Sequence, residues 1–363
     1  MTGMTLGDIR DQDVPVRFLR RLMESSRVPN ALLFWGPSGV GKELAARAFA
    51  KDLLCPGHEN PKSSNAIAAR KVDHGNHPDL RIVGPVKKSR IIDVDAIDAI
   101  IEMASLRPTE SAWRVFILRE AERMRGPAQN HLLKTLEEPL GRSVFILITE
   151  HPHFLLPTIR SRCQRVRFGR LRPETVASIL TRDRETTRDQ ADAIAAVAQG
   201  QMTRAFDLAD TDKREIVLDL VDRLAQGEEP LALSEEFSAY VAALRTAVES
   251  QTKSAPADPE GELSREAREG LKEEQAAAAD AQARRDILDL LYLIESWYRD
   301  VLVFGATGDA SLVLNRDRLD RVRAAGGEGL AEKIAAVDKA RLYLERFITE
   351  DRVFRDLFFA LAS

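Results

Sequence analysis

The 363-residue sequence is poor in cysteine and has no long apolar run. Its two thiols, Cys55 and Cys163, are too few for the disulfide framework of a small secreted domain, so we expect a reducing cytoplasm. Residues 1–13 lack the basic and apolar segments of a signal peptide. No apolar stretch approaches the length that crosses a bilayer, which argues against a membrane-bound function.

The sequence also lacks an excess of charge of either sign. The formal net charge is -4, so the molecule as a whole does not attract nucleic acid electrostatically. Any contact with DNA must therefore be local or shared with partner proteins. Hydrophobic residues make up 44% of the chain, which suits a soluble globular protein, and the length suits two or three domains.

Short apolar runs alternate with helical patterns in the first half of the chain. Ala45, Ala48 and Phe49, for example, repeat at the three- and four-residue spacing of one helix face. Strands separated by helices predict right-handed crossovers and a parallel sheet, which binds ligands at the carboxyl ends of its strands. The predicted strands are residues 31–35, 80–83, 115–118, 144–148 and 165–168, the last at an edge of the sheet.

Strand patterns end at about residue 171, and helical patterns continue to the carboxyl terminus. We therefore predict an α/β domain over residues 1–170, a small helical unit over 171–212 and a larger helical domain over 213–363. Residues 251–284 contain few large apolar side chains and cannot bury much surface. A solvated helix, the tip of a helical hairpin and a disordered segment are the alternatives, and we favour an exposed insertion.

Residues 36–42, GPSGVGK, match the phosphate-loop pattern G-x-x-x-x-G-K between a predicted strand and a predicted helix. Gly36, Gly39 and Gly41 allow consecutive backbone N–H groups to point at phosphate oxygens, and the helix amino terminus adds positive partial charge. Lys42 would reach the β- and γ-phosphates of a nucleotide. The pattern therefore predicts a site for ATP or ADP.

The two positions that normally hold magnesium beside such a loop are altered. Glu43 follows Lys42 where a Ser or Thr hydroxyl usually binds the ion, and Arg119 ends the third predicted strand where an acid is expected. Glu120 occupies the place of the acid that activates water, whereas Glu122 is interpreted as a surface residue. A guanidinium cannot ligate Mg²⁺. We expect that phosphate binding survives without a resident metal and that hydrolysis is lost or very weak.

Two longer segments carry a family resemblance. Residues 131–139, HLLKTLEEP, and residues 156–163, LPTIRSRC, closely resemble motifs of bacterial clamp-loader AAA+ subunits and follow the phosphate loop in the same order. The resemblance covers residues 1–210 and weakens beyond them. It implies a RecA-like P-loop core with a parallel sheet, a helical lid over residues 171–212 and an all-α collar over 213–363, through which such subunits assemble.

Within this family, the chain resembles the delta-prime type more than the gamma/tau ATPase type. The gamma/tau type carries Thr or Ser after the loop lysine and an Asp at the end of the third strand, where this chain has Glu43 and Arg119. Residues 77–79, HPD, and residues 106–108, LRP, also look like the delta-prime type.

Most members of the family have a four-cysteine zinc module after the first helix, and only Cys55 of the four remains here. The other ligands would fall near Ser63, Ala66 and Ala69, none of which can replace a thiolate. A set of one thiol and three imidazoles is an alternative, which we do not favour because its last imidazole belongs to the HPD segment. That set is Cys55, His58, His74 and His77. We expect a loop without zinc.

The resemblance implies roles for five side chains. Arg162 would act as an arginine finger on ATP bound by an adjacent gamma/tau subunit, because positive charge there stabilises the transferring phosphate. Ser161 and Cys163 would support it, the thiol as a buried positioning residue. Thr149 and Arg204 take the places of two nucleotide sensors, which are vestigial if this site does not cycle. A solvated side chain is an equal alternative for Arg204.

The resemblance also implies partners and a location. The chain would belong to the clamp loader of DNA polymerase III, with delta and gamma/tau subunits as partners and no polymerase activity of its own. It would contact the sliding clamp and primer-template DNA through the assembled loader, in the cytoplasm at replication forks. Two alternatives stay open: an active gamma/tau-like ATPase of the same loader, and a nucleotide-binding protein outside replication.

Overall fold

The computed structural model divides the chain into two compact units. The amino-terminal unit consists of Met1–Thr175 and Gly200–Thr203, and the carboxy-terminal unit consists of Val176–Gln199 and Arg204–Ser363. The structure describes residues 4–25, 27–58, 64–85, 91–138, 141–184, 186–254, 265–326, 328–346 and 348–363.

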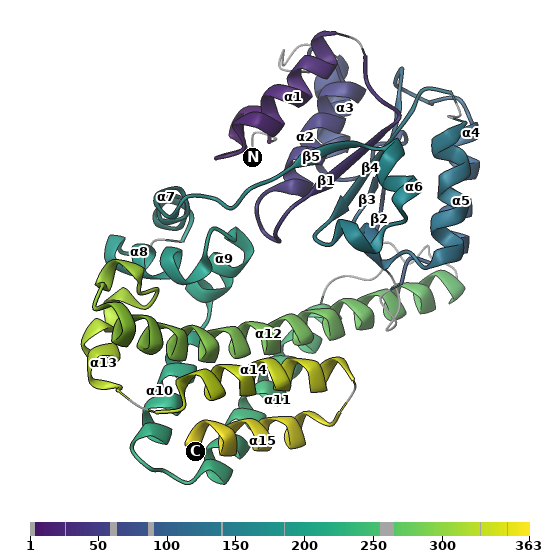
Figure 1. Cartoon of the computed structure of the whole chain (residues 1–363). Helices are drawn as coiled ribbons and strands as arrows, with labels where there is room; N and C mark the ends of the chain where they lie inside the picture. The colour runs from purple at the N-terminus through teal and green to yellow at the C-terminus, as the bar shows by residue number, and fades with distance from the viewer. Residues whose placement is uncertain are drawn as a thin grey trace. The chain divides into compact units, whose positions relative to one another are not determined.

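A five-stranded sheet with the order β2-β3-β4-β1-β5 forms the centre of the amino-terminal unit (Figure 1). All four neighbouring pairs are parallel, and every residue of β3 and β4 is buried, because a parallel sheet is covered on both faces. The predicted α/β class is thus confirmed, and β5 lies at an edge as expected. The strands are β1 (Ala31–Trp35), β2 (Leu80–Val83), β3 (Arg114–Leu118), β4 (Ser143–Thr149) and β5 (Gln164–Arg167).

Helices cover both faces of this sheet (Figure 1). On one face, Ile97 and Leu132 pack with Phe116 and Phe145 of the strands in a fully buried apolar cluster. The two phenylalanine rings stack with centroids 5.0 Å apart. The helices of this unit are α1 (Asp13–Glu24), α2 (Lys42–Leu54), α3 (Ser64–Asp73), α4 (Val94–Ser105), α5 (Gly126–Glu137) and α6 (Pro157–Arg162).

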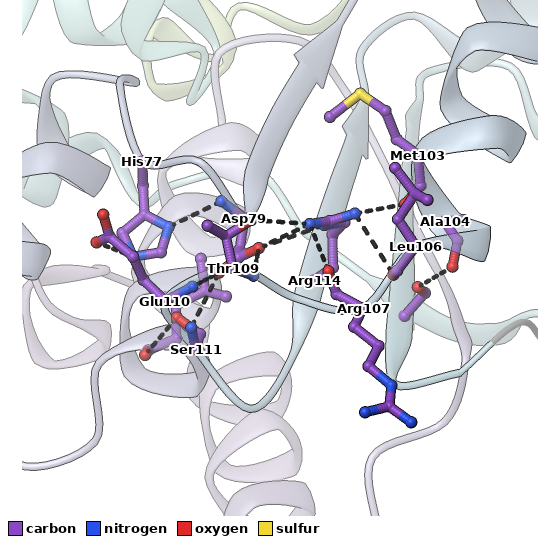
Figure 2. A network of polar contacts seen from close by, with 12 residues as sticks. His77, Asp79, Met103, Ala104, Leu106, Arg107, Thr109, Glu110, Ser111 and Arg114 are labelled. Carbon is purple, nitrogen blue, oxygen red and sulfur yellow. Dashed lines mark hydrogen bonds and ion pairs between the residues drawn. The ribbon is translucent and has the colours of Figure 1, made fainter.

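A buried polar network joins β2, β3 and the turn before β3 (Figure 2). The Asp79 carboxylate is fully buried and accepts hydrogen bonds from the backbone N–H groups of Thr109, Glu110 and Ser111 at 2.7–2.9 Å. The Arg114 guanidinium donates to the same carboxylate at 3.0 Å. Burial alone would raise the pKa of Asp79, but these donors outweigh it and the pKa lies below its usual value. The carboxylate therefore fixes the geometry of the turn into β3.

The regular elements described in the carboxy-terminal unit are all helices, which confirms the predicted helical second half. In its larger part, Phe237 of α11 (Pro230–Ser254) packs edge-on against Phe354 of α15 (Glu350–Ala362). The division of this half into a lid and a collar stays a prediction. The other helices are α7 (Pro173–Asp183), α8 (Arg188–Ala198), α9 (Met202–Asp210), α10 (Lys213–Ala225), α12 (Arg265–Thr307), α13 (Leu319–Ala324) and α14 (Leu330–Glu345).

The predicted insertion over residues 251–284 falls partly outside the described residues. Helix α11 runs to Ser254 and helix α12 begins at Arg265, so residues 255–264 between them lie outside the described part of the chain. None of the described helices is both long enough and apolar enough to cross a membrane.

Candidate functional site

The phosphate-loop segment, residues 36–42, connects β1 to α2 at the carboxyl edge of the sheet. Gly36, Gly39 and Gly41 have φ angles of 147°, 64° and 93°, which side chains other than glycine rarely adopt. A Cβ atom on Gly36 would lie 2.2 Å from the Phe168 carbonyl oxygen, and one on Gly39 would lie 2.8 Å from the Thr203 nitrogen. The three glycines therefore permit a loop fold that excludes larger residues.

Neighbouring segments form hydrogen bonds with this loop on two sides. The Gly36 N–H donates to the carbonyl of Thr149, the buried last residue of β4, at 3.3 Å. On the other side, the Met202 N–H donates to the Gly39 carbonyl at 2.8 Å, and the Ser38 hydroxyl donates to the side-chain oxygen of Gln201 at 2.7 Å. Thr149 thus lies beside the loop, and its sensor role stays a prediction.

The Lys42 side chain lies inside the loop. Its ammonium is buried and donates to the Gly36 carbonyl at 2.7 Å and to the Pro37 carbonyl. Burial lowers the pKa of Lys42, and the nearby carboxylates of Glu150 and Glu122 partly oppose that shift. Loop glycines with positive φ angles, a helix amino terminus and a buried lysine ammonium are the features that bind phosphate groups in loops of this type.

The two altered metal positions meet beside the loop. Glu43, in the first turn of α2, lies with its carboxylate 3.9 Å from the guanidinium of Arg119, which follows β3. The same carboxylate oxygen accepts from Arg47, one helical turn later, at 2.9 and 3.0 Å. A carboxylate already shared by two guanidinium groups does not suit Mg²⁺, which requires oxygen ligands in octahedral geometry. The residues present therefore do not fit the magnesium ion that this type of loop usually holds.

The remaining acids near β3 have altered surroundings as well. Glu120 has a left-handed φ of 49°, and its carboxylate lies 3.7 Å from Arg123. Glu122, which sequence reasoning treated as a surface residue, is half-buried, and its Oε2 atom has no hydrogen-bond partner among the described residues. Its Oε1 atom accepts from the Glu150 N–H at 3.4 Å.

Arg162 ends the short helix α6, which Pro157 begins. Its guanidinium pairs with the Glu137 carboxylate at 2.6 Å, and 38% of its side chain stays exposed. Cys163 follows it in the buried apolar cluster, and burial raises the pKa of this thiol to about 12. The thiol is therefore protonated at neutral pH and packs as an apolar group. The Ser161 hydroxyl donates to the Thr158 carbonyl of its own helix at 2.9 Å.

Comparisons with known proteins agree with this geometry. A family model described as DNA polymerase III, delta subunit, matches residues 11–172. Over 165 residues the chain is 36% identical to DNA polymerase III subunit delta' of Bacillus subtilis, which covers 44% of this chain and 48% of that protein. Residues 11–172 therefore resemble the delta-prime subunits of DNA polymerase III.

Other relatives of this chain are named as tau or gamma/tau subunits. DNA polymerase III subunit tau of Bacillus subtilis is 31% identical over 209 residues, or 56% of this chain and 37% of that protein. The chain thus spans about half the length, or less, of the curated relatives it matches. A solved gamma subunit-related protein of Thermotoga maritima is 16% identical with a TM-score of 0.48, covering 95% of this chain and 98% of that one.

Arg204, the predicted second sensor, belongs to the carboxy-terminal unit. Its guanidinium pairs with Asp289 of α12 at 2.9 Å and lies 3.9 Å from the centroid of the Tyr292 ring. The arginine is therefore ordered by its own unit rather than solvated, and its role toward a nucleotide stays a prediction.

The residues of the alternative zinc set make separate contacts of their own. Cys55 is buried, and burial raises the pKa of its thiol to about 11, while His58 contacts the Cys55 carbonyl at 3.0 Å. His77 is buried and accepts from the Asp79 N–H at 3.1 Å (Figure 2). Within the described ranges, no three His, Cys, Asp or Glu side chains are grouped as metal ligands. Of the three positions where cysteines would fall, Ser63 lies outside those ranges.

Sequence reasoning did not identify Glu150 or Glu137 as parts of the site. Glu150 directly follows Thr149 at the end of β4, so its position after a buried strand was a signal that could have placed it near Lys42. Glu137 lies within the HLLKTLEEP motif, but only the tertiary packing of α5 against α6 brings it to Arg162.

Proposed function

We propose that this chain is a delta-prime-type subunit of the DNA polymerase III clamp loader, which hydrolyses ATP weakly or not at all and assists a neighbouring gamma/tau ATPase. The observation that carries the proposal is the contact between Glu43 and Arg119 at the two positions where an active subunit would hold its metal. The similarity of residues 11–172 to delta-prime subunits supports the same assignment.

Hydrolysis of a nucleotide at this loop would lack its usual source of charge compensation. In related nucleotide hydrolases, a metal ion bridges the β- and γ-phosphate oxygens and neutralises the charge that develops in the transition state. Arg119 supplies positive charge, but a guanidinium cannot ligate the metal. It also cannot place a water nucleophile for Glu120 to activate. Binding without turnover is the outcome that these side chains favour.

The assistance in trans would come from Arg162. Its pair with Glu137 lies on the surface, and such pairs contribute about 0–1 kcal/mol. A phosphate group on an adjacent subunit would therefore replace the carboxylate at low cost. An arginine finger raises hydrolysis rates by about 10³–10⁵ in other systems. Ser161 and Cys163 would hold the end of α6 in place.

The partners follow from the same proposal. Gamma/tau and delta subunits would contact this chain, with the helices of the carboxy-terminal unit as the collar through which the loader assembles. The sliding clamp and primer-template DNA would be reached through the assembled loader, which acts in the cytoplasm at replication forks, and direct clamp binding would belong mainly to delta. The net charge of -4 agrees with DNA contact that is shared rather than made by this chain alone.

The experiment that tests this proposal measures steady-state ATP hydrolysis by the isolated full chain in excess Mg²⁺, for wild type and Lys42→Ala. We expect both proteins to show only background turnover. The active gamma/tau-like alternative predicts clear turnover by wild type that Lys42→Ala abolishes, and that result would contradict the proposal. Failure to co-purify with gamma/tau subunits would instead favour a nucleotide-binding protein outside replication.

A further inference from the structure

The pair formed by Glu43 and Arg119 joins two segments that are 76 positions apart in the sequence, as the two residue numbers show. Glu43 carries one negative charge, and Arg119 and Arg47 each contribute a positive charge within 4 Å of it. The cluster therefore has a net positive charge of one, at the first turn of the helix that begins at Lys42. In a magnesium-dependent loop, the metal would supply the positive charge at this place.

The backbone directs Arg119 toward the loop. Its N–H donates to the Val83 carbonyl at 2.7 Å, which continues the pairing of β2 with β3 by one residue. Its guanidinium then passes over Gly84, where a Cβ atom would lie 3.3 Å from both Nε and one terminal nitrogen. A side chain at position 84 would crowd this path, so the glycine allows the guanidinium to reach Glu43.

Most hydrogen-bonding capacity of Arg119 is unused. A guanidinium has five N–H donors, yet the pair with Glu43 is its one polar side-chain contact among the described residues. The side chain remains 47% exposed. Arginine matches the geometry of phosphate with two parallel hydrogen bonds, so these donors suit an anion that enters the loop.

From these contacts we propose that Arg119 takes the place of Mg²⁺, so that the phosphate loop binds a diphosphate or triphosphate group without a divalent cation. Glu43 would hold the guanidinium at the edge of the loop rather than ligate a metal. The inference deepens the nucleotide site of the proposed function, and it does not depend on the role of Arg162. A ligand bound in this way would stabilise the amino-terminal unit without being hydrolysed.

Calorimetric titration of the purified full chain tests this proposal. The probes are ATP, ADP and inorganic tripolyphosphate, each titrated once with MgCl₂ and once with EDTA. We expect wild-type affinity in EDTA to equal or exceed that in Mg²⁺, because the metal competes with Arg119 for the same phosphate oxygens. Equal binding of tripolyphosphate and ATP would mean that phosphate groups alone are recognised, and tighter binding of ATP would mean that the nucleoside contributes. Both results support the proposal.

Variants separate Arg119 from general charge effects. Arg119→Ala should weaken binding in EDTA about 10- to 100-fold, the effect of losing a charge-assisted hydrogen bond, and Arg119→Lys should lie between it and wild type. Arg123→Ala is the matched control, since Arg123 follows the same strand but pairs with Glu120, and it should bind as wild type does. Glu43→Thr with Arg119→Asp restores the usual metal ligands and should make binding depend on Mg²⁺.

Three results would overturn the inference. Wild-type binding that requires Mg²⁺ would mean that the metal is held despite Arg119. Unchanged affinity in a folded Arg119→Ala variant would remove the guanidinium from the site. Absence of binding by wild type under both conditions would show that the loop takes no phosphate ligand, while the proposed action of Arg162 in trans would remain open to its own test.

Discussion

Replacing Asp79 by asparagine tests how the structure holds the amino ends of β2 and β3 in place. The substitution keeps the shape of the side chain but removes the charge that faces Arg114 at 3.0 Å. Both residues are buried, since Asp79 is 0% exposed and Arg114 is 4% exposed. The remaining guanidinium would therefore lack a counterion in a region that excludes water. Breaking a buried pair by removing one partner costs about 3–5 kcal/mol.

Other hydrogen-bond partners of Arg114 and of the new asparagine could offset part of this loss of stability, but the structure offers few. Arg114 also donates to the carbonyl groups of Met103 and Arg107, but carbonyls carry no net charge to balance it (Figure 2). An asparagine amide has a single acceptor oxygen, so it cannot accept from all three N–H groups that the two carboxylate oxygens of Asp79 now bind. We therefore expect the full range of about 3–5 kcal/mol rather than the smaller value of an exposed pair.

Urea denaturation of the full chain measures this loss of stability, followed by tryptophan fluorescence from Trp35 and Trp113 of the amino-terminal unit and Trp297 of the carboxy-terminal unit. Asp98→Asn is the control, because Asp98 forms a half-exposed pair with His131 and should change stability by less than about 0.5 kcal/mol. The double variant Asp79→Asn with Arg114→Met should be more stable than Asp79→Asn alone, since it removes the unpaired charge. A loss below about 1 kcal/mol for Asp79→Asn, or strictly additive effects, would refute the reasoning.

Three further predictions follow from buried groups of the same unit. Burial holds the pKa of His77 below its usual value, and the backbone N–H donors and Arg114 lower the pKa of Asp79 despite its burial. Both pKa values are therefore lower in the folded state than in the unfolded state. The free energy of unfolding should decline as pH falls below about 6.5, when His77 takes up a proton more readily in the unfolded state, and again below about 4 for Asp79. Denaturation midpoints measured against pH check this. Asp79→Asn should reduce the lower decline, to which Asp8 and Asp11 also contribute because their pKa values are lowered; stability that rises on acidification would contradict the reasoning. Gly36→Ala should destabilise the unit by at least about 1–3 kcal/mol, because φ is 147° and the new Cβ would meet the Phe168 carbonyl, whereas Gly126→Ala, with open space around it, should be tolerated; equal losses would argue against the loop geometry. The thiols of Cys55 and Cys163 should react with iodoacetamide slowly in the native chain and rapidly in denaturant, because burial keeps both protonated, and mass spectrometry would detect fast native labelling if the reasoning were wrong.

The sheet was predictable from the sequence because its strands are short apolar runs bounded by loops. Residues 80–83 form a strand with the predicted bounds, and the edge strand predicted over residues 165–168 is found at an edge over residues 164–167. The phosphate loop was equally readable, since its glycines lie close together in sequence and their spacing is a local signal.

The contacts within the site could not be predicted in the same way. Glu43 and Arg119 each departed from the expected pattern, but their meeting depends on the order of the strands and on the absence of a side chain at Gly84. The HPD segment was noticed as a family feature, whereas its physical role depends on N–H groups about thirty positions later. Such contacts are long-range in sequence, so no local pattern encodes them.

The measurement that tests the central claim most directly is ATP hydrolysis by a reconstituted loader with clamp and primed DNA. The loader would contain this chain as wild type, Arg162→Ala or Arg160→Ala, the last as a control for charge on the same helix. We predict a rate loss of about 10³-fold or more at the site beside this chain for Arg162→Ala alone, seen in single-turnover assays. Equal rates for all three assemblies would contradict the proposed action of Arg162 on a neighbouring subunit.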